Sequence, residues 1–430
     1  MNLKQVLAAF PPKSPYRRLI PSLLSKDETA WKLSYKELKS LDRLAPGEYP
    51  MGNNWKHKIT EALAMLKAAT TLPFAYLGPE WDDPVHELIF PLLRSPHPQL
   101  LPIVLDGYER LSDRSKCAAL SLMGAIGTHE AATGFVSCIR THGWPKGVYS
   151  RVFSELHGLL AHANCLFPDL IVHAGPNIGG IVDVLLAGVA SGEVSFGEGN
   201  IDMEPVNPLV LTELAKALKG AKKFQRPKGL QWRFTEKYYD VRRVAGCWLD
   251  LAGHLRSTSL NPLLKDALSL HDPRLLAYAS TAALRHNMKV PSKVIKRVAE
   301  SHENRTLLFT LLCDIKRKDL FPRKWQTWDA FAAANMVDWL CYPTELGSEP
   351  DQLEKMAVFS SKKETIYVWR FRRGKGPWYA SASGPYELKG SPKPIHGNLT
   401  FSRFDKWDGG TAEQHLEAVV ETLSEWGRVD

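Results

Sequence analysis

The chain has 430 residues, of which 44% are hydrophobic and 23% charged, with a net charge of +9. This composition is typical of folded, soluble proteins and excludes a disordered chain. The longest apolar stretch, IVDVLLAGVA at 181–190, contains Asp183 and is far shorter than the ~20 residues of a membrane-spanning helix. The opening MNLKQVLAAFPP has only a short apolar run and lacks a small-residue cleavage site. We therefore expect a cytoplasmic protein without a signal peptide or a membrane segment.

The six cysteines are scattered through predicted helices, and none forms a C-x-x-C pair. This spacing excludes a zinc ribbon and a disulfide framework of the secreted kind. We expect buried free thiols at Cys117, Cys138, Cys165, Cys247, Cys313 and Cys341.

Residues 113–143, DRSKCAALSLMGAIGTHEAATGFVSCIRTHG, predict two helices with a break between them. The first helix begins at Asp113 and is ended by Gly127, a residue suited to a helix C-terminus. The second has an apolar face with helical three- and four-residue spacing, formed by Ala131, Ala132, Phe135, Val136 and Ile139.

Two short motifs that follow do not support a metal or cofactor site. His157 and His162 are five residues apart and so lie on different faces of a helix, whereas zinc proteases use two His four residues apart with a Glu between them. GPNIGG at 175–180 precedes a predicted helix but lacks the Lys-Ser/Thr of a phosphate-binding P-loop, so we interpret it as a loop between helices. The chain has no G-x-S-x-G motif, and spacing alone does not suggest a Cys-His pair.

Three segments between 240 and 316 share one pattern, in which an acidic residue is followed two positions later by Arg. The pairs recur at intervals of 32 and 31 residues, and they are Asp240/Arg242, Asp272/Arg274 and Glu303/Arg305. Each pair is expected to open a helix, and second helices are predicted between them at NPLLKDALSL and VPSKVIKRVAES. A period of this length with two helices per unit is typical of an α-solenoid.

Within the second unit, His271 stands beside Asp272 and Pro273. A His-Asp pair can hold a metal in phosphohydrolases, but Asp before Pro is also a strong helix start. The nearest other His on this helix, His286, would be about 20 Å away at 1.5 Å per residue. We therefore interpret Asp272 as a helix cap and His271 as a residue just outside the helix.

The stretches DPRLLAYASTAAL and AALSLMGAIGTHEAA resemble HEAT repeats of the short bacterial kind, over residues 85–320. The resemblance implies an α-solenoid in which the matching Asp and Arg side chains form a structural ladder along the turns. Together with the C-terminal part described next, the layout resembles bacterial HEAT-repeat proteins, some of which occur near secreted-toxin systems.

The C-terminal part predicts a small β-β-β-α module. TIYVWRFR (365–372), WYASASGPYEL (378–388) and NLTFSRF (398–404) are rich in β-branched and aromatic residues, and a helix follows at 411–426 with Thr411 as its N-cap. The preceding PTELGSEPDQLE (343–354) gathers four carboxylates, which could act as acid and base. Ser348 and Asp351 also match a capping box, and we favour the start of a helix there.

These elements divide the chain into three predicted parts: an N-terminal helical region (1–84), a HEAT-like α-solenoid (85–335), and a junction with the C-terminal α+β module (336–430). The predicted fold class is mainly α.

The positive charge is concentrated in one part of the chain. Residues 211–330 hold 24 basic and 11 acidic groups, whereas the remainder has a net charge of −4. Within this part, residues 216–243, the basic segment, combine ten Lys and Arg with five aromatic residues. Such a mixture suits an acidic protein surface with aromatic anchors, or phosphates and bases, although a solvated loop would have the same composition. The residues predicted to bind a partner are Lys222, Lys223, Arg226, Lys228, Trp232, Arg233, Lys237, Arg242 and Arg243.

A solenoid offers an extended surface and needs no catalytic centre, so we expect a non-enzymatic binding protein without cofactor or metal. Its predicted partner is a protein with an acidic surface, and the resemblance implies a toxin-neutralising (immunity) or secretion-accessory role. The alternative is a nucleic-acid binder, or a base-excision enzyme similar to the HEAT-like DNA glycosylases, that uses the basic residues of 211–330.

Overall fold

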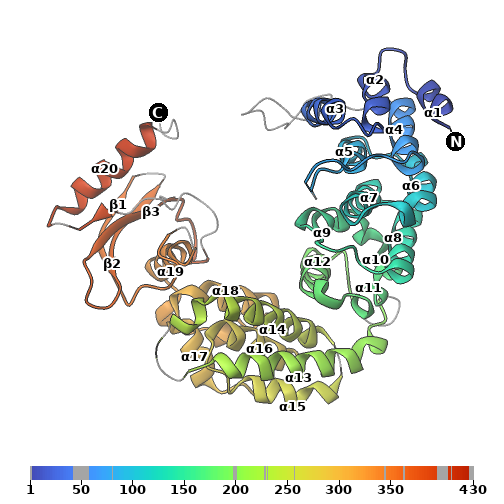
Figure 1. Cartoon of the computed structure of the whole chain (residues 1–430). Helices are drawn as coiled ribbons and strands as arrows, with labels where there is room; N and C mark the ends of the chain where they lie inside the picture. Colours follow the sequence, from blue (N-terminus) through green and yellow to red (C-terminus); the bar gives the residue numbers. More distant parts are fainter. Residues whose placement is uncertain are drawn as a thin grey trace. The chain divides into compact units, whose positions relative to one another are not determined.

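The computed structural model describes residues 2–41, 58–79, 81–196, 201–226, 229, 231–255, 257–342, 345–361, 364–394, 405–407 and 409–425. The chain is mainly helical, has an antiparallel sheet near its C-terminus (Figure 1), and divides into two compact units, Met1–Val206 (unit 1) and Asn207–Asp430 (unit 2). In the described ranges, no helix combines the length and the apolar character needed to cross a membrane.

Unit 1 consists of short helices that pack on neighbours close to them in the chain: α5 packs on α7, α7 on α9, and α9 on α12. Gly124 of α7 permits the close approach of α9, because a Cβ there would lie 2.5 Å from the carbonyl oxygen of Glu155. The helices are α1 (Leu3–Ala9), α2 (Pro15–Leu23), α3 (Glu28–Leu41), α4 (Ile59–Thr71), α5 (Pro84–Ile89), α6 (Leu101–Gly107), α7 (Asp113–Ile126), α8 (His129–His142), α9 (Ser150–Leu156), α10 (Ala163–Leu166), α11 (Asp169–Val172) and α12 (Ile178–Ser191).

The two helices predicted at 113–143 are confirmed as α7 and α8. Gly127 ends α7 with a φ of 70°, a left-handed conformation that glycine adopts without steric cost, and its amide donates to the Met123 carbonyl. Thr128 then caps α8 through a hydrogen bond from the Ala131 amide. All five residues of the predicted apolar face are buried.

In unit 2, α14 packs on α16, α16 on α18, and α18 on α19, while α15 and α17 pack against α16. Asp272 is the N-cap of α16, as predicted, and Pro273 occupies the first helical position. The first predicted start was wrong, because α14 begins at Glu236, four residues before Asp240. The helices are α13 (Asn207–Phe224), α14 (Glu236–His254), α15 (Asn261–Ala267), α16 (Pro273–Arg285), α17 (Ser292–Glu300), α18 (His302–Asp314) and α19 (Trp328–Leu340).

The C-terminal sheet contains β1 (Gln352–Ser360), β2 (Thr365–Arg372), β3 (Tyr379–Tyr386) and the two-residue β4 (Asp405–Lys406), antiparallel in the order β1-β2-β3-β4. Two predicted strands are confirmed as β2 and β3, whereas 398–404 lies outside the described residues. The helix predicted from the Ser348–Asp351 capping box was wrong, because β1 follows instead. The Asp351 carboxylate accepts from the Gly374 amide, 2.6 Å away, and so holds the turn after β2.

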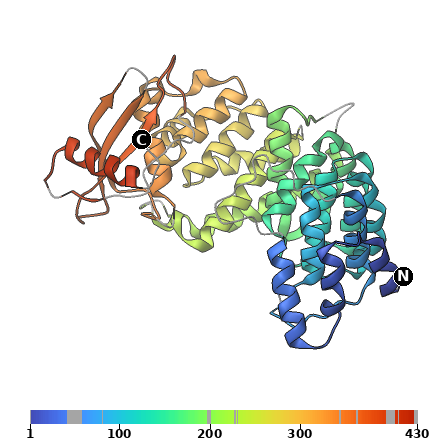
Figure 2. The ribbon, with the colours of Figure 1, turned by 90° about the horizontal axis from the view of Figure 1, so that it is seen from above.

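The closing helix α20 (Ala412–Glu425) is confirmed, and the Gln414 amide donates to the Thr411 hydroxyl. Figures 1 and 2 show this red helix beside the orange strands, and it packs on β2 and β3.

The sheet shares its core with α19. Ala332, Ala333, Met336 and Leu340 of α19 cluster with aromatic side chains of β2 and β3, and the Tyr386 hydroxyl donates to the Asn335 side chain. The predicted boundary at 335/336 therefore falls within a helix whose two halves both contact the sheet core. The first compact unit ends at Val206, a position that the sequence patterns did not indicate.

Candidate partner-binding site

The basic segment begins on the solvent-exposed side of α13. Four apolar residues of α13 recur at helical spacing and are all buried; they are Val210, Leu214, Leu218 and Ala221. The lysines of this helix, at 216, 219, 222 and 223, are exposed. Sequence periodicity alone thus places the first lysines of the segment in solvent.

The end of α13 is closed by Arg226, whose guanidinium donates to the carbonyls of Lys223, Phe224 and Gln225 at 3.1–3.4 Å. This interaction satisfies carbonyl groups that have no partner within the helix. Lys222 forms an ion pair with Asp266 of α15, with nitrogen–oxygen distances of 2.6 and 2.7 Å. Lys223, Lys237 and Arg243 also have exposed side chains, whereas Lys228 lies outside the described residues.

Two of the predicted partner-binding residues, Arg233 and Arg242, are buried instead. Arg233 donates to Glu303 at 3.3 Å and to Glu349 at 2.6 Å, and Arg242 donates to the other oxygen of Glu303 at 2.9 Å. These four side chains are at most 7% exposed. Both guanidinium groups are held by internal carboxylates, so neither is available to a partner.

The protonation states of this network are set by competition between burial and charge. Burial alone would lower the pKa of Arg233, but the charges of Glu303 and Glu349 outweigh it and raise the pKa. Burial alone would raise the pKa of Glu349, but a hydrogen bond from His302 and the charge of Arg233 lower it overall. Both shifts favour the charged forms, so the buried pair stays ionised at neutral pH.

A cleft of about 380 Å³ opens next to this network, entirely within unit 2. Arg226 and Trp232 contribute to its wall from the basic segment, and the cleft is also lined by His271, Arg297, Glu300, His302 and Asp351. The half-buried Trp232 is fixed by a hydrogen bond from its indole nitrogen to the Gly229 carbonyl, at 3.1 Å, and by an edge contact with Tyr238. The cleft therefore combines cations, carboxylates and one positioned aromatic ring.

The pair His271–Asp272 has the predicted capping role. Asp272 is fully buried and accepts from the Arg274 amide at 2.8 Å and from the Tyr238 hydroxyl at 2.7 Å. His271 is held by Arg297, which donates to its carbonyl at 2.8 Å. Among the described residues, no three His, Cys, Asp or Glu side chains are grouped so that they could hold a metal ion.

Sequence reasoning missed Arg297, His302 and Glu349 as members of this site. They lie 54 or more positions beyond the end of the basic segment in the sequence and meet it only when α13–α18 pack together. The sequence pattern assigns Glu349 and the exposed Asp351 to the start of a helix. The signal in the sequence for these site residues is the high density of charged residues around them. It indicates that ion pairs form but does not identify which residues pair.

Comparisons with models of protein families, with curated proteins and with solved structures found no match to this chain. The chain therefore stands as a mainly helical protein with a C-terminal antiparallel sheet. The HEAT-like resemblance, the repeat pattern and the solenoid stay predictions.

Proposed function

We propose that this chain is a non-enzymatic binding protein, with a HEAT-like α-solenoid architecture, that recognises an acidic surface on a protein partner. The observation that carries the proposal is the exposure of three cations, Lys223, Lys237 and Arg243. They are close in sequence to Arg226 and Trp232, which line the cleft. A carboxylate of the partner would meet these cations, and an apolar side chain would contact the Trp232 ring. A toxin-neutralising or secretion-accessory role rests on the resemblance alone.

The aromatic residues favour a protein partner over nucleic acid. Base stacking requires exposed ring faces. Of the five aromatic residues in the basic segment, Tyr238 is fully buried and three are half-buried, while Tyr239 is 55% exposed. Phe234 is further covered by the guanidinium groups of Arg233 and Arg242, 5.4 and 6.0 Å from its ring centre.

The test uses two fluorescent probes of matched charge: a glutamate-rich peptide with one Trp, and a single-stranded oligonucleotide. We expect the peptide to bind more tightly at physiological salt, with a weaker salt dependence than the oligonucleotide, whose binding should fall log-linearly as salt rises. Changing Lys223, Lys237 and Arg243 together to Glu should abolish peptide binding. Trp232→Ala should weaken it more than any single lysine change.

The matched control changes Lys289, Lys293 and Lys296 to Glu, three exposed lysines outside the basic segment. It alters the net charge equally and should leave most of the peptide binding intact. Equal loss in both triple variants would show that total charge, not this site, attracts the peptide. Tighter and steeply salt-dependent binding of the oligonucleotide would support the nucleic-acid alternative and overturn the proposal.

A further inference from the structure

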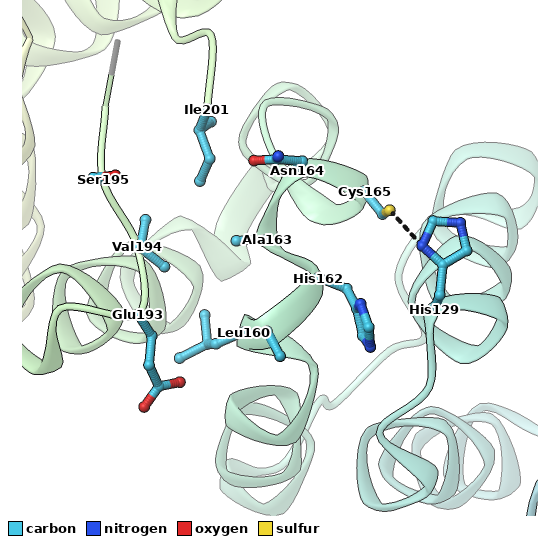
Figure 3. A pocket seen from close by; sticks show the side chains of 11 residues that line it. His129, Leu160, His162, Ala163, Asn164, Cys165, Glu193, Val194, Ser195 and Ile201 are labelled. Atoms are coloured by element: carbon cyan, nitrogen blue, oxygen red, sulfur yellow. Dashed lines mark hydrogen bonds between the residues drawn. The ribbon is translucent and has the colours of Figure 1, made fainter. Parts of the chain in front are cut away.

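A second cavity, of about 310 Å³, lies within unit 1 and contains a thiol next to an imidazole. The Cys165 sulfur of α10 is 3.4 Å from Nδ1 of His129, the first residue of α8. Figure 3 shows the His129 ring facing this sulfur, with His162 beside it. The two imidazole rings make an edge contact, with their centroids 5.7 Å apart.

The remaining walls contain one carboxylate and several apolar side chains. Glu193 and Ser195 line one side, with Leu160, Val194 and Ile201 as the apolar part (Figure 3). Glu130, next to His129 in sequence, also interacts with both imidazoles. Hydrogen bonds from its own amide and from Thr128 lower the pKa of Glu130.

Cys165 lines a cavity, whereas Cys117 and Cys138 are buried. Burial raises the pKa of both Cys117 and Cys138 to about 11, and it also raises the pKa of Cys313 and Cys341. A raised pKa leaves less of the nucleophilic thiolate at neutral pH. The sulfur of Cys165 faces this open cavity, and Nδ1 of His129 lies within hydrogen-bond reach of it.

We propose that Cys165 is a site of thiol–disulfide exchange, at which its sulfur forms a mixed disulfide with a small, positively charged disulfide that enters this cavity. His129 takes the thiol proton, and the thiolate attacks one sulfur of the incoming disulfide. One S–S bond forms as the other breaks, and the departing thiolate receives the proton from His129. One disulfide is consumed and one is formed, so the step needs no further oxidant. Glu193, the carboxylate that lines the cavity, favours a cationic reagent over an anionic one.

The test treats the full chain with cystamine at neutral pH and follows each cysteine by mass spectrometry. A free thiol of ordinary pKa is only a few per cent ionised at pH 7, so activation by His129 should make Cys165 react about tenfold faster than an ordinary thiol. The half-buried Cys247 serves as the internal reference. Reaction of Cys165 no faster than that of Cys247 would overturn the proposal.

Two variants separate activation by His129 from simple exposure of the sulfur. His129→Gln should slow modification of Cys165 about tenfold, and His129→Phe should do the same. The matched control is His157→Gln, because His157 is an exposed His of the same unit that does not line the cavity. If Cys165 is modified at the unchanged rate in both His129 variants, His129 does not activate the thiol and the proposed mechanism is wrong.

The charge preference is tested with three disulfides, each normalised to its rate with N-acetylcysteine. We expect cystamine to react faster than neutral hydroxyethyl disulfide, and glutathione disulfide, which is anionic, to react slowest. Glu193→Gln should narrow the gap between cystamine and the neutral reagent. Equal normalised rates for all three reagents would contradict the predicted class of ligand.

Discussion

In unit 1 the buried carboxylate of Asp83 is held by neutral donors, whereas in unit 2 the buried carboxylates of Glu303 and Glu349 are held by guanidinium groups. Asp83 is 2% exposed and accepts from the amides of Val85 and His86 at 2.9 and 3.2 Å. Its second oxygen accepts from the hydroxyls of Ser115, at 2.6 Å, and Ser112. Arg233 supplies the matching contacts to both glutamates in unit 2.

The difference shows that a buried carboxylate can be hydrogen-bonded in two ways, which differ in how well they tolerate the loss of the carboxylate's charge. A serine hydroxyl can donate or accept, so it can adjust when its partner loses charge. A guanidinium has only donors and keeps its charge, so it needs the carboxylate. The ionic network also joins distant parts of the chain, since Arg233 and Glu349 are 116 residues apart. Unit 2 therefore depends on charge for the connection between its helices and the segment that precedes the sheet.

The largest expected effect follows removal of Arg233. Arg233→Met keeps much of the volume but leaves Glu349 without its cation, and breaking a buried pair in this way costs about 3–5 kcal/mol. Hydrogen exchange in urea, read separately for peptides of each unit, should show the loss in unit 2. Arg243→Met makes the same chemical change at an exposed site and should cost less than about 0.5 kcal/mol. Similar losses in the two variants would mean that the buried network contributes little.

The comparison is sharpened by two isosteric changes. Glu349→Gln places an amide donor against either Arg233 or the His302 amide, which donates to Glu349 at 3.2 Å, and should destabilise unit 2 by about 2–3 kcal/mol. Asp83→Asn keeps an oxygen for the helix cap, and the serine hydroxyls can turn to accept, so the cost should stay below about 1 kcal/mol. The same exchange measurement reads both variants. Equal losses of stability in Glu349→Gln and Asp83→Asn would show that the serine hydroxyls beside Asp83 cannot turn to accept a hydrogen bond.

The smallest expected effect is a dependence on pH. The pKa of Glu349 is lowered in the folded chain, so its contribution to stability is fully present above the unfolded value near 4.5 and is lost as the pH falls through the folded value. In that acidic window the unfolded chain binds more protons, and the stability of unit 2 should fall with decreasing pH. Glu349→Gln should make this slope shallower in urea unfolding measured at several pH values. An identical slope in the variant would assign the acid sensitivity to other groups.

Several features of this chain were predictable from short stretches of sequence. The break at Gly127, the caps at Asp272 and Thr411, and the strands at 365–372 and 379–386 all lie where the residue patterns placed them. Each depends on side chains only a few residues apart, whose relation is set by backbone geometry. The exposed lysines of α13 could be predicted for the same reason, because helical periodicity separates them from its buried face.

Other features depended on tertiary structure. β1 has no clear alternation of polar and apolar residues, since most of its side chains are exposed, and pairing with β2 makes it a strand. The ionic partners of Arg233 and the meeting of Cys165 with His129 depend on which helix faces pack together. A charged residue or a cysteine in the sequence indicates that its side chain needs an interaction partner when it is buried. Which residue becomes that partner depends on helix register over tens of residues, and no local pattern encodes it.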